Sequence, residues 1–194
     1  RAPERTRVFS RILVPDEAFE ELNDPPRWGD KVDHVGPIVQ RLAPAAPGQR
    51  QALLDRLQSP ANELVVSMLG GGAAADRSAQ LQSLCNIFER RGACLHLIVA
   101  WPGSVVPAGL FGWRNTRVVY TRRALELCQL ADLVVSAAGY NSFHEILYHA
   151  IPAIFVPQMA PFMDDQARRA RSASDRGLAE TVGADELFRL EREV

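Results

Sequence analysis

Three polar clusters in the sequence contain the residue types that bind phosphates and sugar hydroxyls. The first is the glycine run of Gly70, Gly71 and Gly72, the second covers residues 139–145, and the third covers residues 164–166. Glycine lets backbone N–H groups approach an anion, and the start of a following helix adds partial positive charge. Carboxylate and carboxamide side chains make the hydrogen bonds that sugar hydroxyls need. The clusters therefore predict a polar pocket, in which the glycine run could hold a phosphate or diphosphate.

The second cluster has two interpretations, and its residues alone favour the structural one. Ser142 followed three residues later by Glu145 is the pattern of a capping box, with Ser142 as the N-cap of a helix and Gly139 in the preceding turn. In the functional interpretation, Ser142 and the loop amides bind a phosphate. Glu145, one turn into the helix, then accepts hydrogen bonds from a diol such as a ribose.

The other two clusters also have structural explanations. Ala74 and Ala75 stand where a dinucleotide-binding fingerprint would have later glycines, so the glycine run could be a tight turn only. Asp164 and Asp165 could open a helix, because an acid in the first turn complements the helix dipole. In the alternative, Asp165 and Gln166 point into the cleft and bind sugar hydroxyls.

Apolar runs alternating with amphipathic segments predict the elements that would position these clusters. Strands are expected at 64–69, 95–99, 116–120, 133–136, 153–156 and 178–182, and helices from Asp76 and at about 122–130, 141–150, 164–176 and 184–192. Continuous apolar strands separated by helices indicate a parallel sheet covered on both faces. The predicted fold class is α/β with a doubly wound parallel sheet. The turns after Leu69 and Ser136 are expected on the same edge of that sheet.

Residues 1–60 differ in composition from the rest of the chain. Prolines and glycines interrupt this region repeatedly, which predicts the end of an N-terminal domain or a linker segment, with a short strand at 11–15 and one exposed helix at about 49–58. Residues 61–194 are expected to form the second, independently folded domain.

Composition excludes several classes of protein. Lys31 is the only lysine among 194 residues, so neither a phosphate loop of the G-K-[ST] type nor a Schiff-base lysine in the main domain is possible. The net charge of -1 gives no indication of a nucleic-acid partner, and no apolar run approaches the ~20 residues of a membrane span. Three widely spaced cysteines and four scattered histidines predict reduced thiols and packed or surface imidazoles, with no metal site.

The order and spacing of the clusters resemble the donor-binding half of GT-B glycosyltransferases. Residues 137–145, followed by Ile151-Pro152, Val156-Pro157 and Asp165-Gln166, are similar both to nucleotide-sugar transferases with an H-C-G-W-N-S-x-x-E box and to the GlcNAc transferase that makes the peptidoglycan lipid intermediate. The resemblance covers roughly residues 64–182. It implies a Rossmann-like half of a GT-B fold that binds a UDP-sugar.

The resemblance also implies which residues bind each part of the donor. The diphosphate contacts are Gly70, Gly71, Gly72, Gly139, Asn141 and Ser142. The ribose contact is Glu145, and the donor-sugar contacts are Asp165 and Gln166. Thr121 and Arg122 would lie beside the base, which family members hold largely through backbone groups.

Two residues depart from the family pattern. Ala137 replaces the box histidine, which removes one possible phosphate donor, and Arg169 stands where an asparagine often follows the Asp-Gln pair. An arginine such as Arg114, Arg122 or Arg123 could supply positive charge to the diphosphate, although a solvated surface position is the more common one for such residues.

In GT-B enzymes the acceptor and the general base belong to the N-terminal domain, and this chain has room for one half only. The resemblance therefore implies hexosyl transfer to an acceptor hydroxyl with no catalytic residue, metal or cofactor assigned to this chain, because the UDP-sugar is a substrate. The implied partners are the nucleotide-sugar donor and a missing acceptor-binding domain or subunit. The implied location is cytoplasmic, with peripheral association at the inner face of the membrane through the acceptor half.

Two alternatives remain open at this stage. A nucleotide-sugar 2-epimerase or hydrolase would share the fold and the turns, and would turn over UDP-GlcNAc without an acceptor. A non-catalytic partner subunit would co-purify with a second small chain and could use the proline-rich segment as its docking arm.

Overall fold

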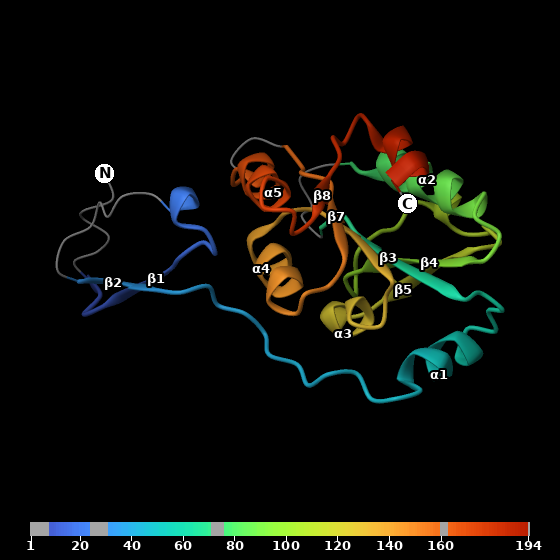
Figure 1. The fold of residues 1–194 in the computed structure, drawn as a ribbon, viewed down its shortest axis with the longest axis horizontal. Helices are drawn as coiled ribbons and strands as arrows, with labels where there is room; N and C mark the ends of the chain where they lie inside the picture. The colour runs from blue at the N-terminus through green and yellow to red at the C-terminus, as the bar shows by residue number, and fades with distance from the viewer. Residues whose placement is uncertain (1–7, 24–30, 71–75, 160–162, 194) are drawn as a thin grey trace.

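The computed structural model describes residues 8–23, 31–70, 76–159 and 163–193. Its main element is a parallel sheet of six strands: β3 (Glu63–Met68), β4 (Cys94–Ala100), β5 (Thr116–Tyr120), β6 (Leu133–Ser136), β7 (Ala153–Phe155) and β8 (Glu180–Thr181). The order in space is β5-β4-β3-β6-β7-β8 (Figure 1). The chain runs outward from β3 to β5, returns to β6 beside β3, and runs outward again to β8. This is the doubly wound α/β sheet that the alternating pattern predicts.

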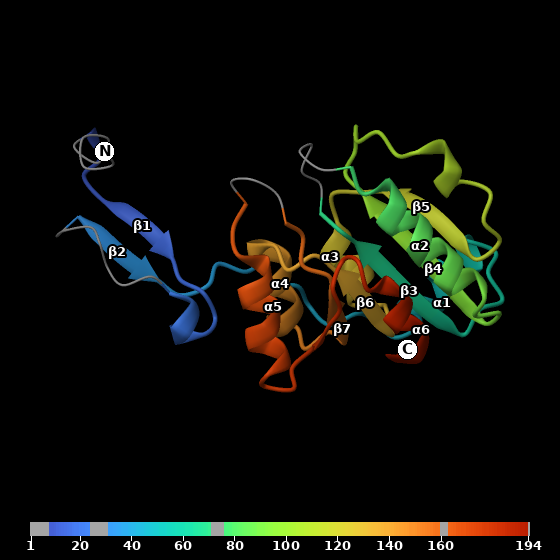
Figure 2. The same cartoon turned by 90° about the horizontal axis from the view of Figure 1, so that it is seen from above.

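Helices cover both faces of the sheet, as Figure 2 shows from above. On one face lie α1 (Gln49–Arg56), α3 (Ala124–Cys128), α4 (Tyr140–Tyr148) and α5 (Gln166–Ser174), and on the other lie α2 (Ser78–Glu89) and α6 (Leu190–Glu193), with the 3-10 turns η3 (Ala108–Leu110) and η4 (Leu187–Arg189). Successive residues of β3 point to opposite faces, so that Leu64 and Val66 join one core and Val65 joins the other. Two buried faces explain why the strand is apolar throughout.

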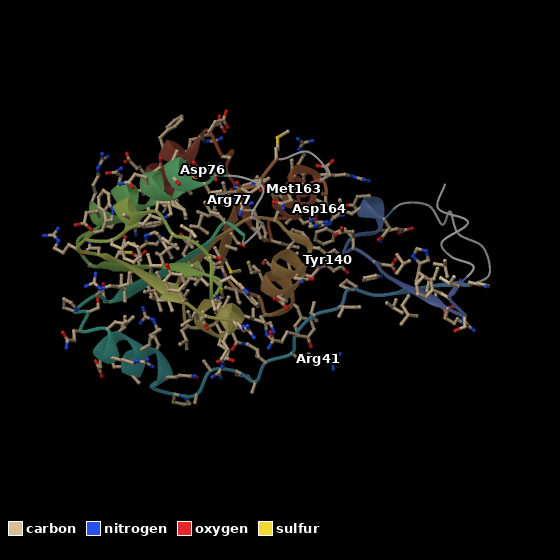
Figure 3. The ribbon with its side chains drawn as sticks, turned by 180° about the vertical axis from the view of Figure 1, so that it is seen from behind. Arg41, Asp76, Arg77, Tyr140, Met163 and Asp164 are labelled. Carbon is tan, nitrogen blue, oxygen red and sulfur yellow. The ribbon has the colours of Figure 1, made fainter. Side chains whose placement is uncertain are left out.

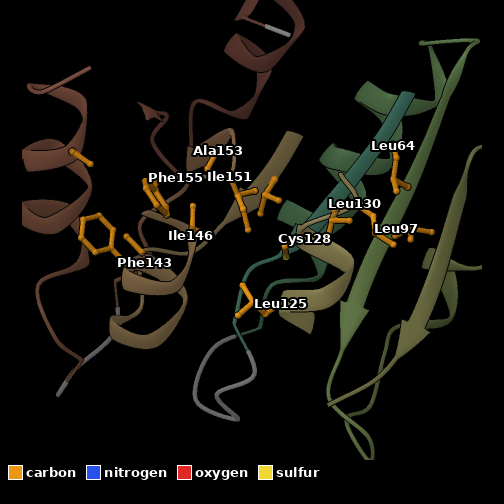
Figure 4. Packing of buried hydrophobic residues seen from close by; sticks show 14 of the residues in the cluster. Leu64, Leu97, Leu125, Cys128, Leu130, Phe143, Ile146, Ile151, Ala153 and Phe155 are labelled. Atoms are coloured by element: carbon orange, nitrogen blue, oxygen red, sulfur yellow. The ribbon is translucent and has the colours of Figure 1, made fainter. Parts of the chain in front are cut away.

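The larger of the two cores joins α1, α3, α4 and α5 to the sheet (Figure 4). Phe143 of α4 and Phe155 of β7 are fully buried there, with ring centroids 5.1 Å apart. These aromatic side chains fix α4 and the end of β7, the two elements that carry the second and third polar clusters.

A buried polar chain crosses three strands on the opposite face. The His96 ring on β4 is hydrogen-bonded through Nε2 to Ser67 Oγ on β3 (2.8 Å) and through Nδ1 to Thr116 Oγ1 on β5 (3.0 Å). Burial lowers the pKa of His96 to about 3, so the imidazole is neutral. His96 is thus a packed histidine with both ring nitrogens bonded, in agreement with the sequence-based prediction for imidazoles.

The cysteines are also structural. Cys85, Cys94 and Cys128 are buried free thiols, and burial raises their pKa values to about 11, 12 and 12. They are therefore the reduced core thiols predicted from their spacing. Among the described residues, no helix has the length and apolar character that crossing a membrane requires.

The first part of the chain forms a small separate sheet. β1 (Ile12–Pro15) and β2 (Val32–Val35) pair in parallel, and a 3-10 turn, η2 (Glu20–Leu22), lies between them in the sequence. Residues 36–48 then run as an extended segment to α1 (Figure 1). The predicted strand at 11–15 and helix at 49–58 are confirmed within two residues at each end, whereas β2 was not predicted.

The last two predicted elements are shorter than expected. The strand expected at 178–182 is reduced to Glu180–Thr181, because its neighbour β7 has only three residues with which to pair. The helix expected at 184–192 begins as the 3-10 turn η4 and becomes α-helical only from Leu190.

Candidate functional site

The strand order changes direction between β3 and β6, and this place is the topological switch point of the sheet. The two strands are parallel neighbours, with Met68 opposite Ser136, and the Ala137 amide donates to the Met68 carbonyl (3.1 Å) where both strands end. Ligands of open α/β sheets bind in the crevice outside the carboxyl ends of the strands at such a point. Gly70 and Gly139 lie in the turns that follow the two strands, so the structure brings the first two predicted clusters to one edge.

Gly70 has a backbone conformation that favours glycine. Its φ is +86°, in the left-handed region. A Cβ at this position would lie 3.1 Å from Nη1 of Arg77, which donates to the Gly70 carbonyl (2.5 Å). Gly70 therefore allows both the turn and the close approach of a guanidinium. The predicted contacts Gly71 and Gly72 lie outside the described residues.

The capping-box prediction for the second cluster is wrong. The N-cap of α4 is Gly139, which is extended (φ −65°, ψ 149°) and accepts the first helical bond from the Phe143 amide (2.9 Å). Ser142 is already the third residue of α4 and makes no cap bond. The side chain of Tyr140, the first residue of α4, is fixed by its hydroxyl, which donates to the Asp16 carbonyl (2.6 Å), a partner distant in sequence.

The early start of α4 changes which groups face the crevice. The amides of Tyr140, Asn141 and Ser142 precede the first helical hydrogen bond, so they are the donors that the start of a helix leaves without an intrahelical partner. They carry the partial positive charge of the helix terminus. The first turn of α4 can therefore bind an anion through backbone groups, with the Ser142 hydroxyl beside them.

Glu145 lies one turn further along α4 and faces the extended segment 36–48. It is half-buried, and its Oε1 accepts from the Gln40 amide (3.4 Å). Among the described residues Oε2 has no hydrogen-bond partner, which leaves one carboxylate oxygen for a ligand hydroxyl. The structure thus places Glu145 between α4 and the linker segment rather than at the switch point itself.

In the third cluster, the structural interpretation is confirmed for Asp165. Asp165 is the N-cap of α5, and its side chain accepts from the Arg168 amide (2.9 Å). Gln166 is 5% exposed; its Oε1 accepts from the Gln158 amide (3.0 Å), and its Nε2 lies 3.7 Å from the position of a Cβ on Gly139. Gln166 therefore joins the loop after β7 to the turn after β6.

A hollow of about 580 Å³ lies along the loop after β7, and Gln158, Met163, Asp164, Asp165 and Gln166 are among its lining residues. Figure 3 shows Met163 and Asp164 on this loop and Tyr140 at the start of α4. A smaller hollow of about 240 Å³ lies near the amino ends of β6 and β7, between the linker and residues such as His149 and Ile151. Its lining contains none of the predicted site residues.

Arg169 connects the second and third clusters to the first part of the chain. It is 5% exposed, and its Nη1 donates to the Ala138 carbonyl (2.7 Å) and to Asp164 Oδ2 (2.6 Å), while Nε and Nη2 bind the Glu17 carboxylate (2.8 and 2.5 Å). Burial opposes the charge of Glu17, but the neighbouring side chains of His144 and Arg169 outweigh it and lower its pKa to about 2. In the sequence Arg169 stood out only as a departure from the family pattern.

The residues predicted beside the base lie two strands away from β3. Thr121 follows β5, and its Oγ1 accepts from the Arg123 amide (2.9 Å). The Arg122 guanidinium lies over the ring of Trp101, 5.4 Å from its centroid, and Trp101 is 55% exposed after β4. Sequence reasoning missed Trp101, although an aromatic residue at the end of a buried strand was a usable signal. Trp101 and Arg122 together form an exposed flat surface on this side of the crevice.

Comparison with known proteins gives a family match over part of the chain and a fold for most of it. Residues 110–194 match the sequence profile of the glycosyltransferase family 28 C-terminal domain. The matched region contains the second and third clusters but not Gly70. No curated protein sequence matches the chain significantly.

Solved glycosyltransferases share the fold. The glycotransferase of kitacinnamycin has 22% identity and a TM-score of 0.60, over 84% of this chain and 40% of its own. The Streptomyces nogalater glycosyltransferase SnogD has 16% identity and a TM-score of 0.55, over 90% and 45%. Medicago truncatula UGT71G1, complexed with UDP-glucose, has 18% identity and a TM-score of 0.57, over 83% and 38%. The chain therefore spans about two fifths of the length of these proteins and has the Rossmann-like fold of one half of GT-B enzymes.

Proposed function

We propose, because residues 110–194 match the glycosyltransferase family 28 C-terminal domain, that this chain binds a UDP-sugar as the donor half of a hexosyltransferase. The observation that carries the proposal is the convergence at the β3–β6 switch point. Gly70, the free amides at the start of α4 and the Gln166 side chain all lie around the ends of these strands. An anion is favoured at this place, and the hollow lined by Asp164, Asp165 and Gln166 adjoins it.

The chain's own contribution to transfer would be stabilisation of the leaving group. When the bond between the sugar and the diphosphate breaks, negative charge develops on the diphosphate. The backbone N–H groups of Tyr140, Asn141 and Ser142, fixed at the start of α4, would stabilise that charge without reorganising. The acceptor hydroxyl and the base that removes its proton would come from a second domain or subunit.

The remaining parts of the donor extend in opposite directions from the diphosphate. The sugar occupies the hollow at Asp165 and Gln166, and the ribose approaches Glu145 beside the linker. The base lies toward Thr121 and the flat surface of Trp101 and Arg122. Support for this donor class comes from UGT71G1, which was solved with UDP-glucose.

Titration calorimetry on the 194-residue chain with UDP, TDP and GDP tests the proposal. We expect UDP to bind, and Glu145→Ala to weaken its binding by about 1–3 kcal/mol, the cost of losing a hydrogen bond to a charged partner. Glu180→Ala, an exposed carboxylate on β8, is the matched control and should leave binding unchanged. Absence of binding by all three diphosphates would contradict the proposal.

An assay with UDP-GlcNAc alone separates transfer from the epimerase or hydrolase alternative. We expect no turnover without an acceptor and a second half. Turnover by the isolated chain would instead support the alternative. A cytoplasmic location, with association at the inner face of the membrane through the acceptor half, belongs to the same proposal and is tested by cell fractionation of the full-length protein.

A further inference from the structure

Arg77 is a charged residue at the switch point to which the sequence patterns gave no role. It directly precedes α2 as its N-cap residue, and its guanidinium folds back to the end of β3, where Nη1 donates to the Gly70 carbonyl (2.5 Å). Figure 3 shows Arg77 at the start of α2, together with Tyr140 on α4 and Asp164 before α5. Arg77 thus lies on the same carboxyl edge of the sheet as the start of α4.

The guanidinium has fewer partners than its burial requires. Arg77 is half-buried, and its Nε is shielded from solvent without a hydrogen-bond partner. Within the described part of the chain no carboxylate lies at ion-pair distance from it. The neighbouring acid Asp76 is engaged elsewhere, because its Oδ1 accepts from the amide (2.9 Å) and hydroxyl (2.5 Å) of Ser78.

Two other arginines of the domain, the buried Arg169 and the half-buried Arg91, are neutralised. Arg169 binds Glu17 and Asp164, and Arg91 binds Glu63. Arg77 differs because burial removes water from its charge and lowers its pKa, while only a neutral carbonyl partly compensates. A partly desolvated cation without a charged partner would be stabilised by binding an anion.

We propose that Arg77 binds the diphosphate of the nucleotide donor, a role that rests on the proposed function. A planar guanidinium presents a fork of N–H donors that matches phosphate oxygens. With Nη1 on Gly70, the N–H groups of Nη2 remain for the ligand. The left-handed turn at Gly70 is consistent with this role, since a Cβ there would lie only 3.1 Å from Nη1 and crowd the guanidinium.

The test compares a nucleoside diphosphate with its own nucleoside on the full 194-residue chain. Whichever of UDP, TDP and GDP binds tightest to the unchanged chain is titrated calorimetrically, and the nucleoside is titrated by ligand-observed NMR. We expect Arg77→Gln to weaken diphosphate binding by about 10- to 100-fold and to leave nucleoside binding within about twofold. Arg77→Lys keeps the charge and should recover part of the loss.

The control is Arg90→Gln, at the other end of α2, whose exposed side chain pairs with Glu191. It should change neither affinity. Equal weakening of diphosphate and nucleoside by Arg77→Gln would mean that Arg77 only supports the Gly70 turn, and this result would overturn the inference. Unchanged diphosphate binding would overturn it as well, but would leave the proposed function standing. If the unchanged chain binds none of the three diphosphates, the proposed function and the inference fail together.

Discussion

The two parallel sheets of this chain differ in how far their residues are buried. Strands β3, β4, β6 and β7 bury most of their residues, whereas no residue of β1 or β2 is buried. A two-stranded sheet with no core of its own is marginally stable in water. The main domain therefore supports itself through its two cores, and the first segment depends on what it contacts.

Those contacts are mainly polar and converge on α4 and α5. Glu17 binds Arg169, the Ala18 amide donates to Nε2 of His144 (2.9 Å), and the Asp16 carbonyl holds the hydroxyl of Tyr140. Phe19 adds one apolar contact, edge-on to Phe143 with centroids 6.1 Å apart. The comparison indicates that substitutions in the core should destabilise the main domain. Removing one of a small number of charged side chains should detach the first segment.

The largest effect is expected from the core of the main domain. Phe143→Ala should cost about 3–5 kcal/mol in the free energy of unfolding, because it leaves a cavity beside Phe155. Leu13→Ala, on β1 where the side chain is 63% exposed, should cost less than about 0.5 kcal/mol. Urea denaturation measures both. Similar losses for the two variants would show that the segment has a core of its own.

The next effect is expected from the residue that joins the two regions. Arg169→Met should lower the free energy of unfolding by about 2–3 kcal/mol. This is less than the cost of breaking a fully buried ion pair, because the Glu17 side chain is 17% exposed and water can partly solvate its charge. The substitution should also release the segment, which hydrogen exchange of the Ala18 amide reports. Arg171→Met, on the exposed side of α5, is the control and should change neither quantity. Retained protection of Ala18 in Arg169→Met would contradict the assigned role.

Acid should weaken the same attachment to a smaller extent. The pKa of Glu17 is about 2 in the folded chain against 4.5 for the free group, so its charge stabilises the fold fully above pH 4.5. This contribution is lost as the pH falls from 4.5 toward 2. The difference in unfolding free energy between the unchanged chain and Glu17→Gln should therefore shrink over that range. A difference independent of pH would exclude Glu17 as the titrating group.

The smallest effect is expected within the two-stranded sheet. Arg11 and Asp33 pair across β1 and β2 at 2.5 Å, but their side chains are 65% and 41% exposed. Arg11→Ala should change the unfolding free energy by less than about 0.5 kcal/mol, since solvent and salt screen exposed pairs. Thermal melts at low and high salt measure this. A loss above about 1 kcal/mol would indicate that the small sheet contributes to global stability.

Local sequence signals predicted the elements with two buried faces, and failed where distant residues decide the structure. The apolar runs of β3, β4 and β6 could be recognised because burial on both sides leaves no polar positions. The anchoring of Tyr140 at the start of α4 could not, because its partner Asp16 lies 124 residues away. The role of Arg169 depends on Glu17, 152 residues away. Strand β2 was missed because its sequence, Val-Asp-His-Val, follows neither a continuous apolar run nor a helical period.

The candidate site was likewise predictable where local sequence decides the structure, and unpredictable where a distant residue does. That the turns after β3 and β6 share an edge follows from the parallel sheet alone, so Gly70 and Gly139 were predictable together. The place of Glu145 beside the linker was not predictable, because Gln40 belongs to a segment without regular structure.

Helices α2 and α4 follow the two central strands but pack on opposite faces of the sheet. Their first turns therefore approach the switch point from two sides, without competing for the same space. The distance between neighbouring strands, about 4.8 Å, sets how far apart the ends of β3 and β6 can lie. A group placed over the ends of β3 and β6 would therefore have one helix start on each side of it, from opposite faces of the sheet.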